Sequence, residues 1–189
     1  MSATWINKQP SNINFLSTTQ FKFEITNCPA VQFFCQSANV PGITLSTAEQ
    51  STRYNAIPIP GDEVSYNDLN IKFIVDENIT NYLEIHRWIR HLGHPYNLQE
   101  LYTAQNNTET SLLYYTGYAK DGSIYSDASL TILNSNFIPK FKIIFKDIFP
   151  IYISDMVFDS STTELNYIIA DATFKYTIYD IVSINNNSQ

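Results

Sequence analysis

Glycine and cysteine are both scarce in this sequence. Only five of the 189 residues are glycine, whereas 13 are tyrosine and 12 are phenylalanine. Few glycines and many aromatic residues favour β-strands over a flexible, glycine-rich architecture. The two cysteines, Cys28 and Cys35, match no zinc-binding spacing. In a reducing compartment we expect them to be two buried free thiols in adjacent strands and not a disulfide.

Long apolar runs are missing as well. No stretch approaches the roughly 18 apolar residues that a membrane-spanning helix needs. The first 15 residues lack the apolar segment typical of a signal peptide. We therefore expect no membrane insertion, and a protein made and kept in a cytosol. With 44% hydrophobic residues, a chain of this length can bury the core of one domain.

Basic residues are fewer than acidic ones. The chain has 11 lysines and arginines against 18 aspartates and glutamates, which gives a net charge of −7. Affinity for nucleic acids comes largely from lysine and arginine contacts to phosphate, so this balance argues against a protein that grips DNA. DNA that passes close by without being held remains compatible with it, because an acidic wall repels phosphate.

Catalytic and metal-binding patterns are absent from the sequence. It contains no glycine-rich phosphate loop, no G-x-S-x-G motif and no cysteine and histidine arrangement with a third orienting group. His86 and His91 are five residues apart, about 140° around a helix, so they cannot bind one ion together. The adjacent acids at 62–63 and 76–77 are ordinary for loops and helix starts. We expect no enzyme, no cofactor and no metal.

One segment, residues 78–93, has a clear helical period. The sequence predicts the only substantial helix within Glu77 to Leu92, started by acids and Asn78 and ended by Gly93. Glu84 is expected on the exposed side. The residues predicted to pack this helix against the rest of the domain are Tyr82, Leu83, His86 and Ile89.

The flanking sequence alternates apolar and polar residues with the period of β-strands. Residues 27–30 are predicted to turn the chain between two strands of a hairpin. The predicted strands are 21–26, 31–38, 69–75, 129–134, 141–146 and 172–179. The stretch FPIYIS after residue 148 is interpreted as a turn or a short strand. The simplest fold is a β domain with a single helix laid against it.

Two connections are long, Asn39 to Tyr66 and His94 to Asp127. In the first, Pro58 and Pro60 cannot donate to a strand ladder, which predicts an edge strand or an excursion from the sheet. Residues 61–63 are predicted to turn it back. The predicted organisation is an N-terminal arm (1–19), one β domain (20–182) with an insertion around 95–127, and a flexible tail (183–189).

The order of several segments resembles the tail tube proteins of contractile-tailed, T-even-like bacteriophages. The front half carries FKFEI, VQFFCQSANVPGI and IPIPGDEVSYNDLNIKFIVDENITNYLEIHRWI, and the back half carries FKIIFKDIFPIYISDMVFDSS and LNYIIADATFKYTIYDI. The resemblance implies a β-barrel-like sandwich of two packed antiparallel sheets with one flanking α-helix. It covers most of the chain.

The resemblance also implies a function. Six copies would close into a hexameric ring, and rings would stack into the hollow inner tube of a contractile tail that conducts DNA during ejection. The implied partners are further copies of the chain, the tail sheath protein, baseplate and tail-terminator proteins, a tape measure protein in the lumen, and DNA without specific binding. The implied location is the tail of the virion, after assembly in the host cytoplasm.

In that family a long loop early in the chain reaches the neighbouring ring. Here it would lie within Asn39 to Tyr66. The resulting candidates for contacts between rings are Val40, Pro41, Gly42, Ile43, Thr44, Leu45, Arg53 and Tyr54.

Three other interpretations stay open at this stage. The insertion and the arm are longer than a plain tube subunit needs, which is compatible with a tube-like initiator or terminator at the baseplate or neck. A carbohydrate-binding β-sandwich would stack sugars on exposed aromatic residues such as Trp5, Trp88 and those around Tyr114, although Trp88 on a helix favours packing. A hydrolase with scattered site residues would show no motif.

Overall fold

The computed structural model describes residues 16–93, 125–161 and 167–184. Most of the predicted arm, the insertion and the end of the tail lie outside these ranges. The elements are β1 (Phe21–Ile25), α1 (Pro29–Phe34), β2 (Cys35–Ala38), β3 (Ile43–Ser51), β4 (Ala56–Tyr66), β5 (Leu69–Ile74), α2 (Thr80–Gly93), β6 (Ser126–Leu133), β7 (Pro139–Ile153), β8 (Ile169–Lys175) and β9 (Ile178–Ser183). The fold is mainly β, with antiparallel sheets and few helices, as predicted.

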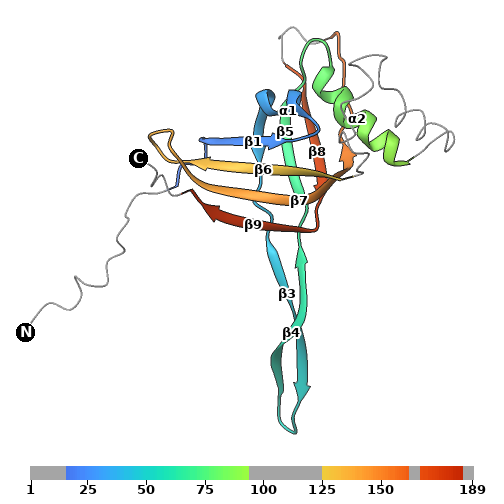
Figure 1. Cartoon of the computed structure of the whole chain (residues 1–189). Coiled ribbons are helices and arrows are strands. Elements are labelled where there is room, and N and C mark those ends of the chain that lie inside the picture. Colours follow the sequence, from blue (N-terminus) through green and yellow to red (C-terminus); the bar gives the residue numbers. More distant parts are fainter. Residues whose placement is uncertain (1–15, 94–124, 162–166, 185–189) are drawn as a thin grey trace, which may run out of the picture.

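Two antiparallel sheets share the long strand β7 (Figure 1). The first half of β7 pairs with β6 and β9, and β6 pairs in turn with β1. The second half, Phe149 to Ile153, pairs with β8, which leads to β5 and β2. Between the halves Asp147 has a φ of 55°, beside a register shift opposite β6. FPIYIS is therefore mostly the continuation of β7, neither a turn nor a separate strand.

The core lies between the two sheets and under the helices. Strand β5 shows why: Leu69, Ile71 and Phe73 are buried while Asn70 and Lys72 alternate with them on the outer face. These side chains meet residues of the other sheet, of α1 and of α2 in one hydrophobic cluster. The largest fully buried side chains besides these are Trp88, Phe23, Phe145, Phe174, Ile85, Ile143 and Ile148.

The hairpin predicted at residues 21–38 is wrong. Residues 29–34 form the helix α1, with Pro29 in its first turn, where a missing N–H costs nothing. Only Cys35–Ala38 are extended, and they pair with β5 instead of β1. A short apolar run such as VQFF fits a buried strand and a helix equally well. Cys28 consequently occupies the N-cap position of α1, without a side-chain hydrogen bond, and is not in a strand. Both cysteines are free thiols, but only Cys28 is buried as predicted, since Cys35 is half-buried.

Helix α2 ends where the sequence predicts, but its buried face is rotated. Asn81, Glu84, Ile85 and Trp88 are the buried positions. Tyr82 and Ile89 are partly buried against the core, Leu83 is half-buried, and His86 is exposed. The packing role predicted for His86 and the exposure predicted for Glu84 are thus wrong.

The buried face of α2 is rotated because of hydrogen bonds, which a hydropathy pattern does not contain. The Asn81 side chain donates to the carbonyl of Ile74 (2.8 Å), and Glu84 accepts from the backbone N–H of Ala30 (3.3 Å). Because these polar groups have hydrogen-bond partners, burying them is not prohibitive. Two polar side chains therefore hold the junction between α2, β5 and α1.

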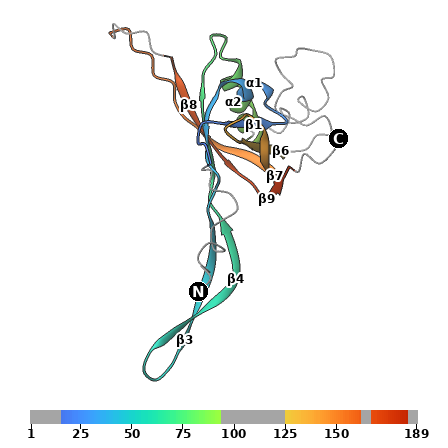
Figure 2. The same ribbon diagram turned by 90° about the vertical axis from the view of Figure 1, so that its left-hand side faces the viewer.

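Strands β3 and β4 form a separate two-stranded ribbon that projects from the body (Figures 1 and 2). The chain reverses at Thr52 to Asn55, where the Thr52 N–H donates to the Asn55 carbonyl (3.0 Å), and not at residues 61–63. Pro58 and Pro60 lie in β4, opposite Glu49 and Thr47. A two-stranded ribbon leaves one edge of each strand unpaired, which accommodates proline. The excursion predicted from the two prolines is confirmed.

Candidate functional site: assembly surfaces

The root of the ribbon is fixed to the body by a group of aromatic rings. Tyr66, at the end of β4, lies edge-on to Tyr176 (ring centroids 6.0 Å apart) and to Tyr179 (5.6 Å). Phe145 of β7 packs beneath both, 5.2 Å from Tyr176 and 5.7 Å from Tyr179. Edge-to-face contacts of this kind add to the stabilisation that comes from area burial. The ribbon thus leaves the body through a packed aromatic junction.

Hydrogen bonds also hold the segments before β3 and after β4 against this aromatic junction. The Tyr179 hydroxyl donates to the Pro41 carbonyl, and the Tyr176 hydroxyl donates to the Asn67 carbonyl, both at 2.9 Å. The Asn67 N–H donates to the Gly42 carbonyl at 3.0 Å. Burial, with Tyr179 and Tyr66 close by, raises the pKa of Tyr176 to about 12. The phenol therefore stays a donor at neutral pH.

Most of the predicted ring-contact residues belong to the ribbon and its root. Ile43, Thr44 and Leu45 lie in β3 and are exposed, and Val40 and Gly42 in the preceding segment are exposed too. Pro41 differs from them because its ring is buried within the subunit. Ile57, Ile59 and Val64 of β4 are further exposed apolar residues that the prediction did not include.

The tip of the ribbon carries the other two predicted residues. Tyr54 is 90% exposed, and the guanidinium of Arg53 lies 5.7 Å from the centre of its ring. Arg53 is the only basic residue between 43 and 66. The tip is thus an aromatic ring with one positive charge, carried away from the body on a ribbon rich in exposed apolar side chains.

Gly61 permits an irregularity midway along the ribbon. The pairing of β3 with β4 shifts register between Leu45 and Thr47. A Cβ on Gly61 would meet Ser46, with the Ser46 carbonyl oxygen only 2.9 Å away. Glycine is required here by close backbone approach.

Two regions outside the prediction are also exposed and apolar. One is the strand β9, which in the described residues pairs with β7 alone and exposes Ile178, Ile181 and Val182. The other is the excursion between β7 and β8, where Val157, Phe158 and Tyr167 are exposed; Tyr152, near the end of β7, is exposed too. An unpaired strand edge and exposed apolar side chains are both typical of surfaces that bind other chains. Neither has a sequence motif, since exposure of an apolar residue depends on what the fold leaves uncovered.

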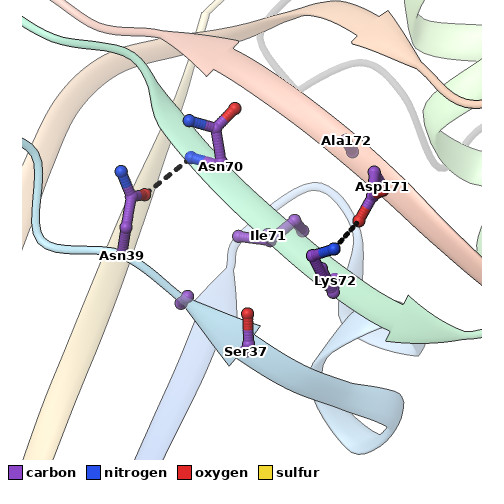
Figure 3. A pocket seen from close by; sticks show the side chains of 8 residues that line it. Ser37, Asn39, Asn70, Ile71, Lys72, Asp171 and Ala172 are labelled. Atoms are coloured by element: carbon purple, nitrogen blue, oxygen red, sulfur yellow. Dashed lines mark hydrogen bonds and ion pairs between the residues drawn. The ribbon is translucent and has the colours of Figure 1, made fainter.

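The second sheet, formed by β2, β5, β8 and the second half of β7, carries several polar side chains around a hollow, among them Asn70, Lys72 and Asp171 (Figure 3). A hollow of about 390 Å³ lies over β2, β5 and β8, lined among others by Asn39, Asn70, Lys72 and Asp171. Asn39 accepts from the Asn70 backbone N–H (2.7 Å), and the ammonium of Lys72 lies 3.4 Å from the Asp171 carboxylate. With its lysine and aspartate paired to each other, this hollow offers neither an activated nucleophile nor a base.

The junction between α2 and α1 contains a buried carboxyl group, that of Glu84. Glu84 is 4% exposed, and desolvation raises its pKa to about 7, while the hydrogen bond from the Ala30 N–H acts in the opposite direction.

The described residues contain no group of three or more potential metal ligands. None of the helices in the described part of the chain could cross a bilayer. Trp88 is in the core and cannot stack a sugar, whereas Trp5 and Tyr114 lie outside the described residues.

Comparison with known proteins identifies the family. The model of the family described as phage tail tube protein matches residues 5–182. The chain belongs to this family. No curated protein sequence matches the chain. Membership supports a structural protein of the tail tube type.

Solved structures with the same fold come from contractile injection systems. A chain of the PVC sheath–tube complex in the extended state is 12% identical, with a TM-score of 0.56, and the match covers 97% of this chain and 99% of that one. A chain of the tube-terminating cap of the anti-feeding prophage is 14% identical, with a TM-score of 0.54, and the match covers 96% and 100%. A chain of the baseplate of the anti-feeding prophage is 11% identical, with a TM-score of 0.54, and the match covers 90% and 97%. These likenesses show that the described part of the chain shares its fold with proteins of these assemblies.

Proposed function

We propose that six copies of this tail tube protein close into a ring, and that rings stack into a hollow tube inside a contractile tail. The observation that carries this proposal is the ribbon β3–β4, which projects from the body with exposed apolar residues along its length (Figure 1). Ordering such a ribbon costs conformational entropy that contacts within the subunit repay poorly. A neighbouring ring would supply the missing contacts.

Ring closure would use the open edges of the sheets. Within the described chain, β1, β2 and β9 each have one unpaired side. Pairing such edges between neighbouring copies satisfies backbone N–H and carbonyl groups and removes a site of uncontrolled aggregation. The number six comes from the likeness to tube proteins and not from the edges themselves.

The passage of DNA is supported by charge. A net charge of −7 disfavours phosphate binding, so DNA would slide and not adhere. The polar side chains on the second sheet suit the lumen, because Lys72 is paired with Asp171 and Lys175 with Asp68. A lysine held by a carboxylate offers less attraction to phosphate than a free one.

The remaining parts of the proposal follow from the same assembly. The partners would be the sheath, the baseplate, the terminator and a tape measure protein, and the complex would be part of the virion tail, assembled in the host cytoplasm. Residues 20–182 would form the single body, with 1–19 as an arm and 183–189 as a tail. Ile43, Thr44, Leu45, Arg53 and Tyr54 would contact the next ring.

Shortening the ribbon tests the proposal. Residues 47–60 would be replaced by Asn-Gly, so that Ser46 and Gly61 are joined by a tight turn. We expect the wild type to form tubes in electron micrographs and six-fold rings by native mass spectrometry. The shortened chain should keep its circular dichroism spectrum and its rings but form no tubes.

Two results would count against this assignment. Tubes built normally by the shortened chain would show that the ribbon does not stack the rings. A wild type that forms rings and never tubes would favour a place at one end of a tube.

A further inference from the structure

The β7–β8 excursion carries a second apolar patch. We call Val157 and Phe158, which are 73% and 74% exposed, the β7–β8 patch. Figures 1 and 2 share a vertical axis, and in both views the excursion lies at the opposite end of the molecule from the tip of the ribbon. The excursion and the tip of the ribbon therefore lie at opposite ends of the described molecule.

The base of this excursion is held in place by its neighbours. The Ser154 N–H donates to the Asp171 carbonyl (2.8 Å), and the Asp171 N–H donates to the Ser154 hydroxyl oxygen (2.9 Å). The Tyr82 hydroxyl of α2 donates to the Ser154 carbonyl at 3.0 Å. The patch is thus anchored to β8 and to α2, which fixes its position relative to the body.

Charge distinguishes the two ends. Residues 149–169 contain no lysine or arginine, and Asp155 and Asp159 lie beside the exposed Val157 and Phe158. Hydrogen bonds from Ser161 lower the pKa of Asp159, so it carries its charge at neutral pH. At the opposite end, Arg53 and Tyr54 lie in the turn of the ribbon, and the acidic residue nearest to them in the sequence is Glu49. An acidic apolar patch and a cationic aromatic tip are complementary.

We propose that the β7–β8 patch of one copy receives the tip of the ribbon, Arg53 and Tyr54, of a copy in the next ring. This rests on the proposed function, because it supplies the surface on which stacking takes place. Two different surfaces at opposite ends make a head-to-tail contact, which propagates along an axis without closing. Tyr54 would pack among Val157 and Phe158, and Arg53 would pair with Asp155.

Cysteine cross-linking tests the contact directly. The double variant Tyr54→Cys/Phe158→Cys, assembled and mildly oxidised, should give a ladder of covalent multimers on a non-reducing gel. The native thiols give little background, since Cys28 is buried and burial raises the pKa of Cys35 to about 11. The matched control is Tyr54→Cys/Phe137→Cys, because Phe137 is 72% exposed but lies in the β6–β7 turn. The control should give no ladder.

Charge reversal gives an independent readout. Arg53→Glu should lose tubes while keeping rings, and Asp155→Arg should do the same. The combination of both changes should regain tubes, because it restores the opposite charges in exchanged positions. A gain of this kind is not expected from a variant that merely misfolds.

The outcomes separate this inference from the proposed function. Wild-type tubes without the ladder, or an equal ladder in the control, would overturn the inference and leave the tube intact. A Phe158→Asp variant that still forms tubes but no longer co-sediments with sheath would assign the patch to the sheath and also overturn it. A wild type without any stacked rings would overturn both.

Discussion

At the scale of single residues, two ionisable groups, the buried Glu84 and the half-buried Tyr176, couple stability to pH. Tyr176 keeps its proton because burial opposes the phenolate, and Glu84 binds a proton more readily than usual for the same reason. In both cases the folded state favours the neutral form. Each therefore contributes stability at low pH that is lost as pH rises, between about 4.5 and 7 for Glu84 and between about 10 and 12 for Tyr176.

Tyr176→Phe should lower the free energy of unfolding by about 0.5–1.5 kcal/mol at pH 8, because the hydrogen bond to Asn67 is lost. The variant should also be less sensitive to alkali. The contribution of Tyr176 is complete below its ordinary pKa of 10.0 and disappears as pH rises through about 12. Urea unfolding between pH 8 and 11.5 measures both effects. Tyr152→Phe, at an exposed position, is the control and should change neither.

Glu84→Gln should flatten the pH dependence near neutrality. The Glu84 contribution is complete below the ordinary pKa of 4.5 and is lost as pH rises through about 7. Glutamine retains an oxygen that accepts from the Ala30 N–H and has no charge to bury. Wild type should therefore lose more stability than the variant between pH 5 and 8. Equal slopes in thermal unfolding, with the exposed Glu77→Gln as reference, would contradict a buried carboxylate that titrates here.

At the scale of elements, the packing of α2 gives a matched pair of substitutions. Ile85→Ala should cost about 2–5 kcal/mol of unfolding free energy, since Ile85 is fully buried in the core. Leu83→Ala removes a half-buried side chain outside the main core cluster and should cost clearly less. The denaturant midpoints of the two variants measure which substitution destabilises the protein more. A larger loss of unfolding free energy for Leu83→Ala would instead support the buried face predicted from hydropathy, which includes Leu83.

Much of the element pattern was predictable, and the failures have identifiable causes. Period-2 alternation located β1, β5, β6 and the core of β7, and Gly93 marked the end of α2, because those signals are local. The helix α1 was missed because a six-residue apolar run has no period of its own. The ribbon was expected as an excursion, yet its strand pairing depends on residues 43–51 meeting 56–66, a partnership that neither segment encodes alone.

The candidate site was predictable only in part for a related reason. Arg53 and Tyr54 were singled out through a family resemblance, and they lie at the tip of the ribbon. Val157 and Phe158 were not singled out, because their exposure follows from where β7 and β8 end. A buried Glu84 escaped hydropathy since its partner, the Ala30 N–H, is 54 residues away.

At the scale of the whole molecule, the open edge at β9 should govern assembly. Ile181 is 59% exposed, so Ile181→Lys should leave the subunit folded while opposing edge pairing with a neighbour. We expect ring-sized species to be replaced by monomers in size-exclusion chromatography and native mass spectrometry. Phe33→Lys, at a more exposed residue of α1, is the control and should still form rings. Rings from both variants would place ring closure at other edges.

The sharing of β7 between two sheets also bears on the order of events during synthesis. Strand β1 pairs with β6 about a hundred residues later, as in the contact of Thr26 with Asp127, and β5 finds β8 only after β7 has been made. The early strands β1 and β5 must therefore leave the ribosome and wait, whereas the two local hairpins, the ribbon β3–β4 and later β6–β7, can pair as soon as both of their strands are made. Of the described strands β9 comes last in the sequence, and it pairs with β7. The body with its two sheets is therefore complete only after all strands from β1 to β9 have been made.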